Sequence, residues 1–209
     1  MINLDSDELE YDKVYRPNDD TYFLLDVLFL EAQFLKKNKN ISQIEKVVEI
    51  GCGTGYVINH FLQFLQKFNI QVKSAVGSDI NQDAVQFSQG VTNFMKNQEV
   101  LKIQKKSILE GVNKKEKQES MQIFICNPPY VPTESEELVK FKDLIKKKDI
   151  FIQKNDEKNA EKISGIDVSY AGGVDGMEVT YQIIDQVQEY MSGDDVFYFF
   201  MKFILFITC

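Results

Sequence analysis

The feature that most constrains the fold is an apolar segment that runs directly into a glycine-rich turn. Residues 46–50 have the composition of a short buried strand and lead straight into Gly51-Cys52-Gly53-Thr54-Gly55. Residues 57–68, which follow, carry apolar side chains at helical spacing. Glycine lets the backbone turn sharply and approach a ligand because no Cβ atom is in the way. The following helix also points its amide dipoles at such a ligand. This order predicts a ligand-binding turn between a strand and a helix.

The same alternation of strand and helix continues along the chain. Strands are predicted at 46–50, 74–78, 100–105 and 121–126, and helices at 20–35, 57–68, 82–96 and 177–191. This alternation implies an α/β fold with a doubly wound, mainly parallel sheet. Asp19 or Asp20 is expected to cap the first helix. The apolar segment 196–209 is expected to form a last strand, because a membrane span takes about 20 residues.

The spacing of the glycines narrows the class of ligand. Dinucleotide sites use GxGxxG, in which the third glycine lies one residue further along. Here the spacing is GxGxG, which is typical of sites for nucleoside–methionine cofactors. Asp79 ends the second strand, where a carboxylate accepts both hydroxyl groups of a ribose. NAD enzymes share this acid, so Asp79 alone does not separate the two classes.

A second chemical signal, Asn127-Pro128-Pro129-Tyr130, follows the fourth strand. Consecutive prolines restrict the backbone and remove amide donors, which leaves carbonyl groups free to accept hydrogen bonds. The Asn127 side-chain carbonyl and the Pro128 carbonyl are expected to accept the two N–H bonds of a planar –NH2 group, with Tyr130 stacked on its face. Such a cradle makes the chemistry largely a matter of positioning. The alternative is a plain proline turn that closes the strand.

Charge and composition argue against several other classes of function. The net charge is −8, which disfavours a protein that grips a nucleic-acid backbone over a broad face. The cysteines (Cys52, Cys126, Cys209) contain no CxxC pair, and the only histidine, His60, is expected to pack or to lie at the surface, so no metal site is expected. Residues 1–13 lack the apolar core of a signal peptide. We expect a reducing compartment, the cytoplasm or else the nucleus, and no membrane association.

With these motifs, the chain resembles the Rossmann-like class I methyltransferases of the NPPY group. Residues 15–26 are similar to the opening motif of HemK-type glutamine methyltransferases, and residues 171–179 are similar to their AGGxxGxEV segment. The motifs match over nearly the whole chain, so the resemblance implies a single domain over 1–209 with S-adenosyl-L-methionine as the cofactor. The chain starts almost directly at the opening motif, as the eukaryotic and archaeal members do, without the N-terminal helical domain of bacterial members.

The resemblance also assigns roles to individual residues. It implies that Asn127, Pro128, Pro129 and Tyr130 are catalytic. The residues that it implies for cofactor binding come from five segments of the chain: Asp20, Thr21, Glu49, Gly51, Cys52, Gly53, Gly55, Asp79, Ile80, Ser107, Ile108 and Asn127. Ser107 stands where relatives often carry an acid that contacts the adenine amino group, and a serine still accepts one hydrogen bond.

The implied substrate is the glutamine of the GGQ motif in a class I peptide release factor. The family also implies a heterodimer with a small zinc-binding activator subunit, docked on an edge of the sheet over apolar surface. Two competing interpretations are an adenine N6-methyltransferase acting on DNA or RNA, because the same loop grips an exocyclic amine, and a catalytically silent assembly partner. The acidic charge and the lack of a target-recognition domain disfavour a nucleic acid as the main substrate. Family relatives have also been credited with lysine and small arsenic substrates.

The chain departs from the family pattern at two places besides Ser107. Residues 140–162 hold eight lysines and five acids, and look like a charged insertion of roughly twenty residues beside the substrate entrance. The chain stops after 196–209, whereas relatives continue with a helix and two more strands. The sheet is therefore expected to be shortened at its C-terminal end, with an apolar edge exposed.

Overall fold

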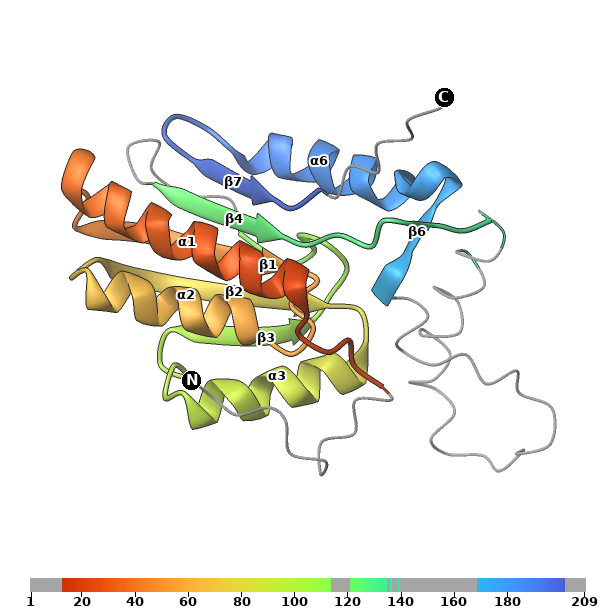
Figure 1. Cartoon of the computed structure of the whole chain (residues 1–209), viewed down its shortest axis with the longest axis horizontal. Helices are drawn as coiled ribbons and strands as arrows, with labels where there is room; N and C mark the ends of the chain where they lie inside the picture. Colours follow the sequence, from red (N-terminus) through yellow and green to blue (C-terminus); the bar gives the residue numbers. More distant parts are fainter. Residues whose placement is uncertain (1–12, 114–120, 135, 137–138, 140–168, 202–209) are drawn as a thin grey trace.

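A five-stranded parallel sheet forms the centre of the computed structural model, which describes residues 13–113, 121–134, 136, 139 and 169–201. The strands are β1 (Gln43–Ile50), β2 (Gln71–Asp79), β3 (Leu101–Lys105), β4 (Gln122–Cys126) and β7 (Val196–Phe199). The helices around the sheet are α1 (Asp19–Asn38), α2 (Tyr56–Lys67), α3 (Gln82–Phe94) and α6 (Glu178–Tyr190). Figure 1 shows α1 and α2 lying across the same face of the sheet. The predicted doubly wound α/β fold is confirmed.

The strand order β3-β2-β1-β4-β7 creates a switch point beside β1. From β1 the chain moves outward through β2 and β3, and then returns to place β4 on the other side of β1. One register row crosses all five strands, at Leu101, Ala75, Val47, Ile123 and Val196. In open α/β sheets, ligands bind outside the carboxyl ends of the strands at such a switch point.

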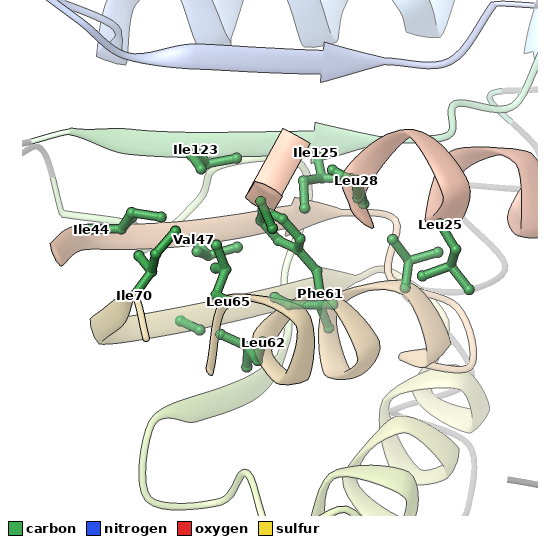
Figure 2. Close-up of a cluster of buried hydrophobic side chains, with 14 of the residues drawn as sticks. Leu25, Leu28, Ile44, Val47, Phe61, Leu62, Leu65, Ile70, Ile123 and Ile125 are labelled. Carbon is green, nitrogen blue, oxygen red and sulfur yellow. The ribbon is translucent and has the colours of Figure 1, made fainter. Parts of the chain in front are cut away.

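Successive side chains of the central strands point to opposite faces of the sheet and belong to two separate hydrophobic cores. The larger core packs α1 and α2 on the sheet, and Figure 2 labels these members of it: Leu25, Leu28, Ile44, Val47, Phe61, Leu62, Leu65, Ile70, Ile123 and Ile125. Val48 and Phe124 belong to the second core, which includes Ile183 and Val187 of α6. Burying one such side chain fully contributes roughly 1.5–3 kcal/mol to stability. Packing on both faces of β1 and β4 therefore holds the helices against the sheet.

The start of α1 corrects one prediction, because the cap is Asn18 rather than Asp19 or Asp20. The Asn18 side chain accepts a hydrogen bond from the backbone N–H of Thr21 at 3.3 Å. The Thr21 hydroxyl accepts one from the backbone N–H of Asn18 at 3.3 Å, which completes a capping box. Asp19 and Asp20 lie in the first turn instead, where negative charge interacts favourably with the helix dipole.

Two short strands pair outside the main sheet, and no sequence pattern predicted them. β5 (Val131–Pro132) pairs in parallel with β6 (Ala171–Gly173), which leads into the short 3-10 helix η1 (Val174–Gly176). The expected last strand does begin at Val196, and within the described residues it ends at Phe199. Residues 202–209 and the insertion predicted at 140–162 lie outside the described residues. None of the described helices is long and apolar enough to cross a membrane.

Candidate active site

An open cavity lies at the carboxyl ends of β1, β2 and β4, at the switch point of the sheet. Its walls come from the glycine turn, the residues after β2, β3 and β4, the segment before α1, and the start of α6. The predicted site residues that line it are Thr21, Glu49, Gly51, Cys52, Gly53, Asp79, Ile80, Ser107, Ile108, Asn127, Pro128, Pro129 and Tyr130. Asp20 and Gly55, which were also expected at the cofactor, are not among the lining residues.

Two glycines of the turn are needed for different reasons. Gly53 has a φ of +51°, in the left-handed region, and a Cβ built there would meet nothing within 4 Å. Gly55 has a φ of +70°, and a Cβ there would lie 2.0 Å from the Ser88 hydroxyl oxygen of α3. Gly53 therefore leaves open space at the cavity, whereas Gly55 is required by the close packing of the turn against α3.

Asp79 connects the turn to the end of β2. One carboxylate oxygen accepts a hydrogen bond from the Gly53 N–H at 2.9 Å, and the other accepts one from the Asn81 N–H at 2.8 Å. Burial raises the pKa of Asp79, and the N–H groups of Asn81, Gly53 and Ile80 oppose this rise. A carboxylate accepts about four hydrogen bonds. Three N–H groups already contact this carboxylate, so Asp79 retains about one acceptor position for a hydroxyl group of a ligand.

Glu49 is buried beneath the turn and caps the helix that follows it. Gly55, the N-cap residue of α2, has no side chain to bind the free N–H groups of the first turn. The Glu49 carboxylate accepts the Ile58 N–H at 3.1 Å instead. Burial raises the pKa of Glu49 well above its usual value, the Ile58 bond lowers it, and the nearby Asp79 charge raises it further. Its predicted role at the cofactor is thus accompanied by a structural one.

Asn127 presents an acceptor without a donor. Its Oδ1 atom is buried and has no hydrogen-bond partner among the described residues. Buried polar side-chain atoms in proteins are nearly always paired, so an unpaired one at a cavity is available to accept a hydrogen bond from a ligand. Pro128 and Pro129 follow and contribute no N–H of their own. This end of the cavity is therefore suited to a ligand that donates N–H groups.

Tyr130 is held at both its side chain and its backbone. Its hydroxyl donates a 2.5 Å hydrogen bond to Asp20 Oδ2. Its carbonyl oxygen packs on Gly176, where an added Cβ would lie 2.2 Å from that oxygen. Gly176 has a φ of +71°, which also favours glycine. The glycine-rich segment 171–176 therefore supports the loop that carries Tyr130, although the two are far apart in the sequence.

Comparison with known proteins identifies the family. The family model named methyltransferase small domain matches residues 28–157, which is more than half of the chain. The chain belongs to this methyltransferase family. A curated relative, the eRF1 methyltransferase catalytic subunit mtq2 of Schizosaccharomyces pombe, is 30% identical over 198 residues, covering 90% of this chain and 72% of the relative. This methyltransferase therefore falls in the HemK-type eukaryotic branch, as its motifs predicted.

Solved structures are also similar to the methyltransferase, and one of them shares its fold. The hMettl16 catalytic domain, in complex with a MAT2A 3'UTR hairpin, has a TM-score of 0.51 at 10% identity, covering 87% of this chain and 55% of that one. The ribosomal protein L11 methylase of Lactobacillus delbrueckii subsp. bulgaricus has a TM-score of 0.44 at 13% identity, covering 87% of this chain and 61% of that one. The chain thus spans less than two thirds of either solved chain. At 10% identity the likeness to the hMettl16 domain concerns the fold alone.

Several lining residues of the methyltransferase were not predicted to belong to the site. They include Val14, Tyr15, Pro17, Tyr56, Tyr170, Val179 and Gln182. Tyr15 and Pro17 belong to the opening motif, so the motif itself was a signal for them. Tyr56 directly follows the glycine turn, whereas Val179 and Gln182 reach the cavity only because α6 packs beside it. Val179 ends the 171–179 segment, so that motif was a signal for it, whereas the contact of Gln182 is tertiary and leaves no local pattern in the sequence.

Two further features complete the site. Ile108 has a φ of +46°, which is unusual for a β-branched residue, and its carbonyl accepts a 2.8 Å hydrogen bond from the Ser78 hydroxyl. His60 is buried, and its Nδ1 lies 2.8 Å from the Tyr56 carbonyl oxygen. Of the two expected roles, packing and exposure at the surface, His60 therefore has the packing role. The described residues contain no group of three or more side chains that could hold a metal ion.

Proposed function

We propose that this methyltransferase transfers a methyl group from S-adenosylmethionine to the side-chain amide nitrogen of the GGQ glutamine in a class I peptide release factor. The observation that carries the proposal is the buried, unpartnered Oδ1 of Asn127 at the cavity. A primary amide offers two N–H donors on a planar nitrogen, which suits this acceptor. The name of the S. pombe relative, eRF1 methyltransferase catalytic subunit, supports the choice of substrate.

The cavity walls have the chemistry that S-adenosylmethionine requires. Asp79 retains an acceptor position for a ribose hydroxyl group, and Gly53 leaves space that a Cβ atom would fill. Ser107 lines the cavity and offers a hydroxyl group to the adenine amino group. Bound there, S-adenosylmethionine supplies an electrophilic methyl group.

The chain's own contribution to the reaction is to orient and polarise the amide nitrogen. An amide nitrogen is a weak nucleophile because its lone pair is delocalised into the carbonyl group. When Asn127 Oδ1 and the Pro128 carbonyl accept its N–H bonds, electron density on the nitrogen rises. Tyr130 stacks on the amide plane and restricts its rotation, so most of the rate gain comes from positioning.

We also propose a small zinc-binding activator subunit as the partner of this chain. The relative is named a catalytic subunit, which denotes an assembly of more than one chain. β3 is an edge strand of the described sheet, and an unpaired edge offers N–H and C=O groups to another chain. α3, which packs beside β3, ends at Phe94, whose side chain is 71% exposed. This surface suits a partner that contributes both a strand and apolar contacts.

The deciding experiment measures transfer of a radiolabelled methyl group from S-adenosylmethionine. The enzyme is co-expressed with the zinc-binding activator from the same organism and offered three substrates. These are the release factor, the same factor with the GGQ glutamine changed to alanine, and an adenine-containing oligonucleotide. The Asn127→Ala enzyme serves as the inactive control.

Label on the unmodified factor alone, absent with the Asn127→Ala enzyme, is the expected result. Equal labelling of the alanine factor would reject glutamine as the target. Label on the oligonucleotide alone would favour adenine N6-methylation. Cofactor binding without label on any substrate would contradict the proposed reaction.

A further inference from the structure

We infer that Asp20 is a positioning residue that fixes the ring of Tyr130 for methyl transfer, and is not a ligand of the cofactor. This inference rests on the proposed function for its consequence, because a fixed ring matters only if Tyr130 stacks on a planar substrate group. The resemblance to HemK-type enzymes implied a different role for Asp20, at the cofactor. The contacts of the two residues favour the new assignment.

Asp20 lies behind Tyr130 as seen from the cavity. Tyr130 lines the cavity and Asp20 does not. The hydrogen bond between them, 2.5 Å from the Tyr130 hydroxyl to Asp20 Oδ2, joins residues that lie 110 positions apart in the chain. The charged acceptor makes this a strong contact. Asp20 therefore reaches the cavity through Tyr130.

The hydrogen bond to Asp20 restrains the side chain of Tyr130, which the loop backbone alone does not. Gly176 holds the Tyr130 backbone, since the carbonyl oxygen of Tyr130 packs on its Cα. A fixed backbone still leaves the side-chain torsions free, and the last torsion of a tyrosine is broad. A hydrogen bond at the far end of the side chain restricts its swing. Backbone and hydroxyl contacts together hold the ring at two distant points.

Asp20 is itself held in place by the segment in front of α1. The capping box between Asn18 and Thr21 fixes the first helical turn, and the Asn18 amide donates to the Tyr15 hydroxyl at 2.6 Å. The Lys13 carbonyl accepts a 2.8 Å hydrogen bond from the side chain of Asn81. Asn81 also donates its backbone N–H to Asp79. The segment thus links the ribose-side carboxylate to the carboxylate that holds Tyr130.

The protonation state of Tyr130 suits this role. Burial raises the pKa of Tyr130 above its usual value, and the hydrogen bond to Asp20 and its charge raise it further. The hydroxyl therefore stays protonated over the working range of the enzyme and remains a donor. Removing the Asp20 carboxylate should lower the pKa of Tyr130.

The test is a double-mutant cycle on the enzyme–activator complex, using Asp20→Ala, Tyr130→Phe and the double variant. Each single change is expected to lower kcat about tenfold, as loss of one charged hydrogen bond does, and the double variant should lower it no further. Asp20→Asn keeps an acceptor oxygen and should recover most of the activity. Asp19→Ala is the matched control, since it removes a neighbouring first-turn acid without touching Tyr130.

Two readouts do not depend on the substrate. The dissociation constant of S-adenosylhomocysteine, measured by calorimetry, should change less than about twofold in Asp20→Ala. Ultraviolet titration should show tyrosine ionisation at lower pH in Asp20→Ala than in the wild type. The difference should be much smaller on the Tyr130→Phe background, where Tyr15, whose pKa the Asp20 charge also raises, is the tyrosine that still responds.

The outcomes separate this inference from the proposed function. Multiplicative losses in the double variant, or a dissociation constant raised by Asp20→Ala and not by Tyr130→Phe, would overturn the positioning role. An unchanged tyrosine titration would overturn the hydrogen bond itself. A wild-type complex that leaves the release factor unlabelled, with the tyrosine difference present, would overturn the proposed substrate and support the Asp20–Tyr130 pairing.

Discussion

Glu49 and Ile58 are joined by a 3.1 Å hydrogen bond across the glycine turn, from the Ile58 backbone N–H to the buried carboxylate. The bond connects the end of β1 to the first turn of α2, so a single side chain fixes the two elements that flank the turn. An acid in this position is costly to bury, and it stays there because it satisfies an N–H group that Gly55 cannot reach. The turn is therefore sensitive to the charge of Glu49.

Glu49→Gln is expected to flatten the dependence of stability on pH. Burial raises the pKa of Glu49 in the folded protein above the ordinary value of 4.5. As pH rises from that value toward the raised pKa, the unfolded chain releases a proton that the folded protein retains. The free energy of unfolding therefore falls with rising pH in this window. Glutamine keeps an acceptor oxygen for Ile58 and does not ionise, so the fall should be smaller.

Urea unfolding over a series of pH values measures this effect. Glu45→Gln is the matched control, because Glu45 lies half-buried on the same strand and pairs with Lys73. It is expected to keep the wild-type slope. Identical slopes in the wild type and Glu49→Gln would contradict the assignment.

Asn127→Ala is expected to abolish transfer while cofactor binding survives. The substitution removes the side-chain acceptor for the substrate amide and leaves the glycine turn and Asp79 untouched. Loss of one such preorganised group costs about 10²–10³ in kcat. Single-turnover methyl transfer gives the rate, and calorimetry with S-adenosylhomocysteine gives the affinity. A comparable loss of affinity would show that Asn127 serves the cofactor instead.

Asp79→Ala is expected to weaken cofactor binding first, by roughly 10- to 100-fold, because it removes charged hydrogen-bond acceptors from the cavity. It also releases the Gly53 and Asn81 N–H groups that the carboxylate accepts. Asp83→Ala, in the first turn of the neighbouring α3, is the control and should leave the affinity near the wild-type value. An unchanged dissociation constant in Asp79→Ala would refute the ribose assignment.

Gly176→Ala is expected to destabilise the protein by about 1–3 kcal/mol and to lower activity, since a Cβ at this left-handed position meets the Tyr130 carbonyl. Gly90→Ala is the contrasting substitution. Gly90 lies within α3, and a Cβ there meets nothing within 4 Å. It should stabilise the protein by about 0.5–1 kcal/mol. Chemical unfolding compares the two, and similar effects from both would remove the special role of Gly176.

The sequence carried enough information for the fold and for most of the cavity, because each element has a local pattern. Strand, glycine turn and helix follow one another at 46–68, and parallel strands bring their carboxyl ends to one edge. Asp79 and Asn127 could therefore be placed at the same cavity from their positions at strand ends alone. The family motifs added the assignment to HemK-type methyltransferases.

Contacts between distant residues could not be predicted in this way. Asn18, Asp19 and Asp20 are all good capping residues, and only the three-dimensional setting selects Asn18. The pairing of β5 with β6 involves too few residues for any periodic signal. The bond between Asp20 and Tyr130 depends on α1 lying across the sheet beside the loop after β4, and no pattern along the chain predicts that contact.

The pairing of β5 with β6 has a consequence for how this enzyme tolerates change. Thr133 donates its N–H to the Gly173 carbonyl at 2.9 Å, and Gly173 returns its own N–H to the Thr133 hydroxyl at 2.9 Å. These two hydrogen bonds join the point where the chain leaves the site to the point where it returns, and so they close a loop. Lengthening a closed loop costs little, roughly 0.6 kcal/mol for each doubling. A change in the length of chain between Thr133 and Gly173 is therefore expected to cost little stability, because this pairing still closes the loop.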